Sequence, residues 1–322
     1  MELLKSYQES LTERLQNVVN QGEPAQLYDP IKYILKLGGK RLRPTLTLLT
    51  ADFFGGSMDK AMDAALAVEL FHNFSLIHDD IMDNAPLRRG HETVHEKWDV
   101  NTGILSGDAM LILAYRLFEG YEPPMFQELA KLFSKTAIEV CEGQQYDVDF
   151  EERDDVTIAE YIRMIDYKTA VLVGAAMKMG AIVANASPSC QEGIYEFGRN
   201  LGIAFQLQDD YLDAFGDPKN FGKQVGGDII ANKKTFLYLK ALEGTSDGNA
   251  LRNLFSITPK DPSDKIETVK NIYVGSGAAK ATEDEIERYT QKANTVLDGI
   301  DLSDEKKERL RLFGAWLMNR SV

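Results

Sequence analysis

Apolar residues recur three and four positions apart along almost the whole chain, which is the spacing of amphipathic α-helices. No segment shows the strict alternation of apolar and polar residues that a half-buried strand requires. The pattern therefore predicts an all-α fold with long helices around a shared interior. The predicted helices cover approximately residues 2–19, 26–37, 44–54, 58–83, 91–98, 107–120, 124–147, 158–185, 189–215, 228–243, 262–275, 282–299 and 303–319.

Local start and stop signals support this list of helices. Thr157 with Glu160, and Thr282 with Glu285, fit the capping box, in which each side chain binds the other residue's backbone N–H. Glycines mark the expected helix ends, because glycine readily adopts the left-handed conformation that closes a helix. They are Gly38-Gly39, Gly55-Gly56 and Gly216.

The chain has 322 residues, and no stretch rich in Pro, Gly or Ser divides it, so we expect one domain over residues 1–322. Its formal net charge of −14 argues against nucleic acid and anionic membrane surfaces, because both attract basic faces. The most apolar stretch, Val171–Ala186, contains Lys178 and is too short to span a bilayer. Two cysteines and an N-terminus without a signal-peptide layout favour a soluble protein of the reducing cytoplasm.

Three carboxylates follow the DDxxD pattern near the end of the helix predicted over residues 58–83. They are Asp79, Asp80 and Asp83. Residues four apart on a helix share one side, so Asp79 and Asp83 are neighbours there. Like charges packed this closely repel each other and are tolerated best with a cation between them. Oxygen ligands with room for water and phosphate suit Mg²⁺, so we predict a magnesium site at this helix end.

The same spacing recurs in Asp209, Asp210 and Asp213, near the end of the helix predicted over residues 189–215. One copy of so short a motif is also consistent with a solvated helix end. Two copies, each after a strongly apolar helical stretch, favour a functional site over two unrelated solvated helix ends. Two facing clusters would form a pocket that binds several Mg²⁺ ions and, through them, a diphosphate.

A basic segment, GGKRLRP, occupies residues 38–44 and precedes both clusters. Arginine forks bind phosphate oxygens bidentately, and lysine adds a point charge. By itself the segment slightly favours a solvated basic turn. In so acidic a chain, further basic residues near the acidic motifs favour anion binding. These residues are Arg88, Arg89, Lys168, Lys223 and Lys233.

Taken together, these motifs resemble the trans-isoprenyl diphosphate synthases of the polyprenyl synthetase family. The resemblance rests on GGKRLRP, HDDIMDN with LRRG, KTA at residues 168–170, and GKQVGGDI with NKKT after the second DDxxD. It implies a single all-α bundle of the isoprenoid synthase type around a central cavity. It also implies an enzyme that condenses isopentenyl diphosphate with allylic diphosphates, and a homodimer.

The resemblance implies a role for each matching residue. The Mg²⁺ ligands, for as many as three ions with bound diphosphate, would be Asp79, Asp83, Asp209 and Asp213. Residues that act on the allylic diphosphate as it ionises would be these aspartates with Asp80, Asp210, Arg88 and Lys168. Further contacts to the allylic substrate would come from Thr169, Gln206, Lys223 and Lys233. The isopentenyl diphosphate pocket would contain Gly39, Lys40, Arg43, His72 and Arg89. Gln144 and Asp147 match a polar patch lining the cavity.

The chemistry explains these residue types. Cleavage of the allylic C–O bond leaves a diphosphate anion, whose charge metal ions and basic side chains stabilise. Neither a Ser–His nor a Cys–His pair is required. The histidine spacings around His91, Glu92 and His95 could suggest zinc or a di-iron site, but the further ligands are missing, and a structural role is favoured. His78 is expected to orient a neighbouring carboxylate.

Product length is expected to depend on residues one to two turns before Asp79, namely Phe71, Phe74 and Ser75. An aromatic residue five positions before the first Asp, without one four before, resembles short-chain synthases that make twenty-carbon products. Fifteen carbons, as in farnesyl diphosphate, remains an alternative, and Phe74 is also consistent with ordinary core packing. A terpene cyclase and a non-catalytic partner subunit are further alternatives. GGKRLRP with Arg89 argues against the first, and two whole aspartate clusters argue against the second.

Overall fold

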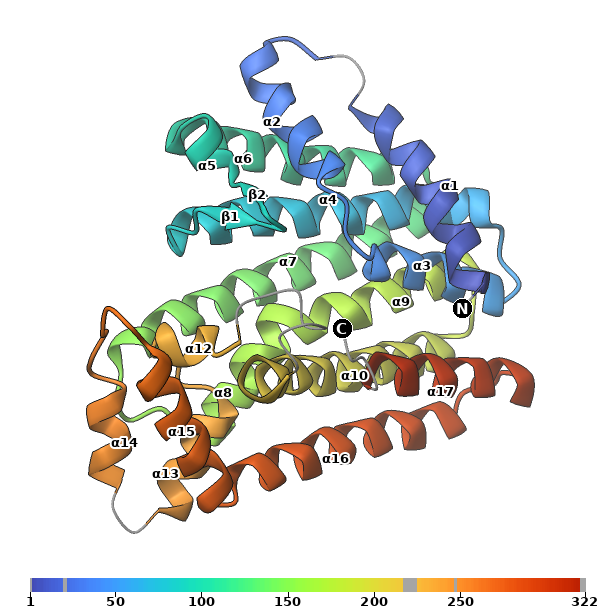
Figure 1. Ribbon diagram of the computed structural model, residues 1–322. Helices are drawn as coiled ribbons and strands as arrows, with labels where there is room; N and C mark the ends of the chain where they lie inside the picture. The colour runs from blue at the N-terminus through green and yellow to red at the C-terminus, as the bar shows by residue number, and fades with distance from the viewer. Residues whose placement is uncertain (1, 20–21, 217–224, 246–247, 319–322) are drawn as a thin grey trace. The chain divides into compact units, whose positions relative to one another are not determined.

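The computed structural model describes residues 2–19, 22–216, 225–245 and 248–318, and almost all of its regular structure is helical (Figure 1). The α-helices are α1 (Glu2–Val18), α2 (Ala25–Lys36), α3 (Leu42–Phe53), α4 (Met58–Met82), α5 (Val94–Lys97), α6 (Val100–Arg116), α7 (Pro123–Glu152), α8 (Ile158–Ile165), α9 (Val171–Val183), α10 (Pro188–Phe215), α12 (Gly227–Ile230), α13 (Phe236–Gly244), α14 (Gly248–Leu254), α15 (Ser263–Gly275), α16 (Ala278–Asp298) and α17 (Asp304–Met318). A 3-10 turn, η1 (Leu117–Gly120), follows α6, and a π-turn, η2 (Asp166–Ala170), joins α8 to α9. The all-α prediction is confirmed.

Contacts between residues divide the chain into two compact units. Unit 1 comprises Met1–Thr136 and Ala175–Tyr195, and unit 2 comprises Ala137–Gly174 and Glu196–Val322. The first aspartate cluster and the GGKRLRP segment belong to unit 1, and the second cluster belongs to unit 2. The expectation of one domain with a central cavity stays a prediction.

Helix α4 is the centre of unit 1, where it packs against α3 and α6. Every residue from Ala64 to Phe71 is buried, so this helix is enclosed on all sides rather than on one face. Four of its buried residues are alanines, which let neighbouring helices approach closely. A central helix of this kind holds its C-terminal end, and with it Asp79 and Asp80, in a fixed place.

In unit 2, α13 packs against α14, α15, α16 and α8 around a second apolar core. The start of α8 is capped as predicted. Thr157 Oγ1 accepts from the Glu160 backbone N–H, and the Glu160 carboxylate accepts from the Thr157 backbone N–H. The glycine stops at residues 38–39, 55–56 and 216 are also confirmed, because α2, α3 and α10 end just before them.

Several local predictions were wrong, each for a structural reason. The second proposed capping box is interior to α16, which begins after left-handed Gly277, and Thr282 donates its hydroxyl to the Ala278 carbonyl inside the helix. The helix predicted over residues 91–98 is shorter, because His91–Glu92 (β2) pairs with Leu87–Arg88 (β1) in a small antiparallel hairpin. The helix predicted over residues 228–243 is two helices, α12 and α13, and α14 was not anticipated.

No helix in the described ranges combines the length and the apolar character needed to cross a bilayer.

Candidate active site

The first aspartate cluster lies where α4 ends in a Schellman motif. Asn84 adopts a left-handed φ of 48°, and the backbone N–H groups of Ala85 and Asn84 donate to the carbonyls of Asp80 and Ile81 at 2.9 and 3.3 Å. The helix therefore stops directly after the motif. Asp79 is half-buried and Asp83 is exposed, whereas Asp80 is fully buried.

Asp80 is bound by Arg88. The Arg88 Nε donates to both carboxylate oxygens at 2.9 and 2.7 Å, and its Nη2 donates to Oδ1 at 2.6 Å. Arg88 reaches Asp80 from strand β1, which turns back at once into β2 through Arg89 and Gly90, both with positive φ. Two left-handed residues in a row fit a type I′ turn, which suits the twist of a two-residue hairpin.

Arg89, in that turn, contacts the glycine loop between α2 and α3. Its Nη1 donates to the Gly38 carbonyl. A Cβ atom at Gly39 would lie 2.8 Å from the Arg89 Nη2, and the φ of Gly39 is 124°. Glycine is favoured at position 39 chiefly by this backbone conformation, which L residues with side chains rarely adopt. Gly39 and Arg89, both assigned to the isopentenyl diphosphate pocket by the resemblance, thus lie close together, and the pocket itself stays a prediction.

Arg43 and His72 contact each other in unit 1, with the Arg43 Nη1 3.2 Å from the His72 Nε2. A guanidinium can only donate, so Nε2 accepts and the neutral ring carries its proton on Nδ1. Burial, followed by the charges of Arg43, Arg89, Arg88 and Arg41, lowers the pKa of His72 well below its usual value. His72 is thus a neutral acceptor within a group of arginines.

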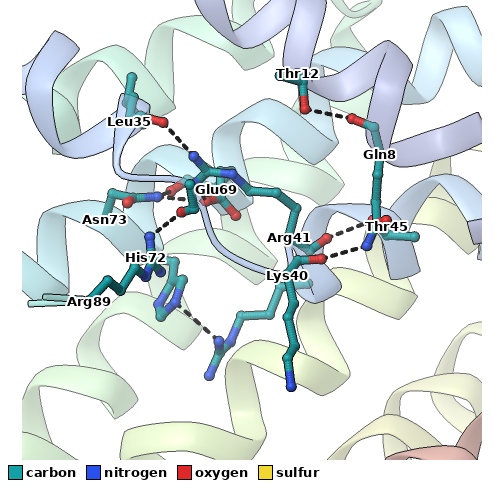
Figure 2. Close-up of polar contacts among 12 residues, drawn as sticks. Gln8, Thr12, Leu35, Lys40, Arg41, Thr45, Glu69, His72, Asn73 and Arg89 are labelled. Atoms are coloured by element: carbon teal, nitrogen blue, oxygen red, sulfur yellow. Dashed lines mark hydrogen bonds and ion pairs between the residues drawn. The ribbon is translucent and has the colours of Figure 1, made fainter. Parts of the chain in front are cut away.

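Sequence reasoning missed the partners of Arg41 in this region. Arg41 forms an ion pair with Glu69, and Glu69 also accepts from Asn73 (Figure 2). A lone acidic residue in an otherwise apolar stretch of α4 is the signal that could have identified this contact. His78 was also misjudged. Its Nε2 lies 3.2 Å from the Ile104 carbonyl and 3.9 Å from Asp108 on α6, so it contacts that helix rather than orienting Asp79.

The second aspartate cluster lies on α10 in unit 2, and its central member, Asp210, is buried. The hydroxyl of Tyr161 donates to Asp210 Oδ2, and Gln206 Nε2 donates to Asp210 Oδ1 at 3.0 Å. The Oε1 of Gln206 in turn accepts from the Thr169 hydroxyl at 3.1 Å. The structure therefore brings Thr169, Gln206 and Asp210 together in one chain of hydrogen bonds.

The electrostatics of Asp210 differ from those of Asp80. Burial, and then the nearby Asp228 carboxylate, raises the pKa of Asp210 well above its usual value, while the hydrogen bonds from Tyr161 and Gln206 act in the opposite direction. Burial and the charge of Asp210 also raise the pKa of Tyr161 well above its usual value, so its phenol keeps its proton and acts as a donor.

Asp213 joins α10 to the segment that carries Lys233. The Asp213 Oδ2 accepts from the Asp228 N–H at 2.9 Å, and its backbone carbonyl accepts from the Gly226 N–H at 2.6 Å. The Lys233 N–H in turn donates to the Asp228 carbonyl at 2.9 Å. Lys233 is thus tied through its backbone to the second cluster. Lys223 lies outside the described residues.

Lys168 and Thr169 lie on the π-turn η2, where the sequence had predicted an unbroken helix. π-turns occur often at functional sites because they turn side chains out of the regular helical register. Lys168 Nζ donates to Asp147 on α7 at 2.5 Å. Neighbouring glycines permit close packing around η2, because a Cβ at Gly143 would lie 2.2 Å from the Lys168 nitrogen and one at Gly202 would lie 2.6 Å from the Ala170 Cα. Gln144, which adjoins Gly143, is buried.

An ion pair between a buried carboxylate and a partly exposed arginine fixes the start of the π-turn. The Arg199 Nε and Nη2 donate to the two carboxylate oxygens of Asp166 at 2.7 and 2.5 Å. This bidentate pair joins η2 to α10, which also carries Gln206 and Asp210. No sequence pattern indicates this pair, since Asp166 and Arg199 are 33 residues apart.

The residues assigned to product length lie in an aromatic cluster of unit 1. The Phe74 ring packs against Phe71 and His78, with ring centroids 5.5 and 4.7 Å apart. Phe71 is fully buried and contacts Phe133 at 5.3 Å, which gives it a core-packing role. Ser75 donates its hydroxyl to the His72 carbonyl at 2.9 Å.

The donor set of both clusters fits a hard divalent cation. All of the predicted ligands are carboxylate oxygens, the type that Mg²⁺ prefers. Within the described ranges, no three Asp, Glu, His or Cys side chains come together as a complete metal site. Mg²⁺ commonly takes its remaining ligands from water and substrate phosphates, which agrees with such a partial protein shell.

The family model described as polyprenyl synthetase matches residues 24–273. The short chain isoprenyl diphosphate synthase of Methanothermobacter thermautotrophicus is 36% identical over 99% of this chain and 98% of its own length. The geranylfarnesyl diphosphate synthase of Aeropyrum pernix is 37% identical over 92% of this chain and 95% of its own. A crystal structure of a geranylgeranyl pyrophosphate synthase superposes with a TM-score of 0.95 at 57% identity and covers 98% of both chains.

The ring of His72 should titrate well below the usual range of a histidine. We expect its NMR resonances to stay those of the neutral Nδ1–H tautomer down to a pH well under 6.5, because burial and four arginines disfavour a further positive charge. An Arg43→Met variant should shift the titration toward ordinary values. Resonances of His72 that titrate at or above pH 6.5 would contradict the assignment.

The same shift predicts a pH dependence of stability. As pH falls below about 6.5, the unfolded chain protonates at position 72 while the folded chain does not, so the free energy of unfolding decreases. Above about pH 6.5 the ring is neutral in both the folded and the unfolded chain, so this loss of stability is absent. Chemical denaturation of the wild type and of His72→Gln at several pH values would isolate the pH dependence of the unfolding free energy that is due to His72. The variant should lack that pH dependence.

Proposed function

The chain belongs to the polyprenyl synthetase family, and we propose that its two aspartate clusters hold an allylic diphosphate for attack by isopentenyl diphosphate. It is a trans-prenyltransferase of the short-chain type. The proposal assigns substrates and residues to that activity. The observations that support it are the contacts of Arg89 with the Gly38–Gly39 loop and of Arg43 with His72, together with the nearness of His72 to Arg88, which binds Asp80 of the first aspartate motif within unit 1.

The proposed reaction begins with ionisation of the allylic C–O bond. Mg²⁺ at Asp79, Asp83, Asp209 and Asp213 would neutralise charge on the departing diphosphate. Arg88, Lys168 and Lys233, with Lys223, bind the same diphosphate and stabilise its increasing negative charge. Thr169 and Gln206 lie beside the ionising carbon, where their polar atoms stabilise the allylic cation. Asp80 and Asp210, each fixed by hydrogen bonds, hold the clusters in shape.

Isopentenyl diphosphate is the nucleophile. Lys40, Arg43 and Arg89 bind its diphosphate, and the backbone at Gly39 lets that group approach the loop closely. The carbon–carbon double bond attacks the allylic cation, and the new carbocation loses a proton to the released diphosphate. His72 stays neutral in this arrangement and orients Arg43, so it adds no charge of its own.

We propose a twenty-carbon product, geranylgeranyl diphosphate, with fifteen carbons as the alternative. Phe74 supports the assignment because it lies five residues before Asp79, and its ring is held between those of Phe71 and His78. A bulky side chain held in place can act as a fixed floor for a growing prenyl chain. Phe71, buried behind it, supports the floor, and Ser75 occupies little space.

A direct assay tests the proposed function. The protein is incubated with Mg²⁺, isopentenyl diphosphate and farnesyl diphosphate, and the products are sized after phosphatase treatment. We expect geranylgeraniol. No diphosphate release would refute the proposal, and a cyclic hydrocarbon formed from farnesyl diphosphate alone would indicate a terpene cyclase instead.

Neutralising one aspartate of either cluster should abolish most turnover. We expect Asp79→Asn and Asp209→Asn each to lower kcat by about 100-fold or more, since each removes charge that stabilises the leaving diphosphate. Asp301→Asn, a change at an exposed site outside the clusters, is the matched control. Circular dichroism should show unchanged helicity, and near-normal turnover in both cluster variants would contradict the metal assignment.

Removing the Phe74 ring should lengthen the product. We expect Phe74→Ala to yield products with one or more additional five-carbon units, because the floor moves deeper into the protein. Phe126→Ala, at a more exposed ring in the same unit, should leave product length unchanged. An unchanged product from a folded Phe74→Ala enzyme would place the floor elsewhere.

We also propose that the protein is a homodimer. Helix α6 exposes Val100, Ile104, Leu105 and Ile112, with Leu105 and Ile112 60% and 58% exposed and seven residues apart on one face. A row of exposed apolar residues on one helix is the feature that a second copy would cover. Leu105→Glu/Ile112→Glu should therefore shift the mass in light scattering from dimer to monomer. Val274→Glu on α15 should not, and a wild-type monomer would refute the proposal.

A further inference from the structure

Arg41 is in the middle of the basic GGKRLRP segment, yet its side chain is directed into the protein. It is only 8% exposed, and its guanidinium pairs with Glu69, whose side chain is 3% exposed. The same guanidinium donates to the Leu35 carbonyl near the end of α2. In Figure 2 the Lys40 side chain extends away from this contact, so adjacent cations have different environments.

Glu69 is held as a carboxylate by more than one donor. Its Oε1 accepts from the Asn73 Nδ2 at 2.7 Å as well as from Arg41, and Asn73 also donates to the Glu69 backbone carbonyl at 2.8 Å. A buried charge is tolerated when it is paired and hydrogen-bonded, whereas removal of one partner leaves an uncompensated charge. The pair therefore constrains where Arg41 can lie.

The ion pair of Arg41 with Glu69 stabilises an unusual backbone conformation in the turn between α2 and α3. Arg41 has φ 47° and ψ 38°, a left-handed conformation that is unfavourable for a residue with a side chain. The surrounding carbonyls are also bound. Lys40 O accepts from the Gln8 side chain at 2.6 Å, and Arg41 O accepts from the Thr45 hydroxyl at 2.6 Å. With Arg89 bound to Gly38 O, the turn from α2 to α3 is fixed from several sides.

We propose that Arg41 is a positioning residue, and that its ion pair with Glu69 orients Lys40 and Arg43 toward isopentenyl diphosphate. Arg41 itself does not contact the substrate. The proposal rests on the function proposed above, since it explains what holds the basic residues of the isopentenyl diphosphate pocket in position. Arg43 lies two residues further along, at the start of α3, and meets His72, so the turn at Arg41 sets its direction.

The opposite view is that Arg41 is a third substrate-binding cation. The two views predict changes of opposite direction in the affinity for isopentenyl diphosphate when Glu69 is replaced by Gln. If Glu69 only offset the charge of a substrate-binding arginine, Glu69→Gln would strengthen the binding of an anion, because a nearby negative charge is removed. If Glu69 holds the turn through Arg41, Glu69→Gln weakens binding, because the turn is less firmly fixed. The direction of the change distinguishes the two views.

The test is isothermal titration of isopentenyl diphosphate into the full-length protein without an allylic partner, together with steady-state kinetics on both substrates. For Glu69→Gln we expect the Kd and KM for isopentenyl diphosphate to rise about ten-fold, because small displacements of binding groups have effects of this size. The KM for farnesyl diphosphate and kcat at saturation should change less than about two-fold. Unchanged or tighter binding of isopentenyl diphosphate by Glu69→Gln would overturn the proposal.

A double variant separates positioning from stability. Arg41→Met/Glu69→Met replaces the buried pair with apolar side chains, which is often neutral for stability. We expect a melting temperature near that of the wild type but an isopentenyl diphosphate KM still raised about ten-fold. Wild-type affinity in the folded double variant would overturn the proposal. Lys178→Met, which removes a cation from a surface ion pair in the same unit, should leave affinity unchanged.

The two levels of the proposal fail in different ways. A wild-type protein that neither binds isopentenyl diphosphate nor forms a prenyl product overturns the proposed function and the positioning role together. A wild type that does both, alongside variants with unchanged isopentenyl affinity, overturns only the role of Arg41.

Discussion

A buried charge is tolerated best beside a partner of opposite sign, and such pairs hold elements together within each unit of the protein. An unpaired charge within a protein interior costs several kcal/mol, so buried ionised groups occur in pairs with further hydrogen bonds. In unit 1 these pairs are Asp80 with Arg88 and Glu69 with Arg41. In unit 2, Asp166 pairs with Arg199. Each pair connects two different elements, eight residues apart for Asp80 and Arg88 and 28 and 33 residues apart for the other two, and thereby sets the place of the chain between them.

The pairs are close in sequence to the groups proposed to bind substrate. Arg41 lies between Lys40 and Arg43, and Arg88 directly precedes Arg89. Asp166 is two residues before Lys168. In each region, a residue held by an ion pair lies within two residues of a basic residue proposed to bind substrate. Two of those neighbours are themselves held by the protein, because Arg89 donates to the Gly38 carbonyl and Lys168 donates to Asp147. An enzyme that binds two diphosphates gains from this arrangement, because like-charged side chains must be held close together before the substrate arrives.

The sequence predicts the type of fold and the motifs assigned to substrate binding. It does not predict which residue of a motif is held by the protein interior and which is not. Periodicity identified the helices, and the Thr157–Glu160 signal marked a real helix start. The same signal failed at Thr282, because left-handed Gly277 had already started α16. The π-turn at Asp166–Ala170 was not predicted, because it depends on close approach by Gly143 and Gly202, which are distant in sequence. Arg41 and Arg43 have the same side chain, and only their tertiary contacts distinguish them.

The two DDxxD motifs illustrate why spacing alone is insufficient. Their central aspartates are both buried, but Asp80 faces a guanidinium, whereas Asp210 faces a phenol and an amide. Burial and the Asp228 carboxylate raise the pKa of Asp210 and so favour its protonated form, whereas Asp80 is paired with the Arg88 guanidinium. Identical motifs can therefore make unequal contributions to one site, and the neighbouring side chains determine the difference.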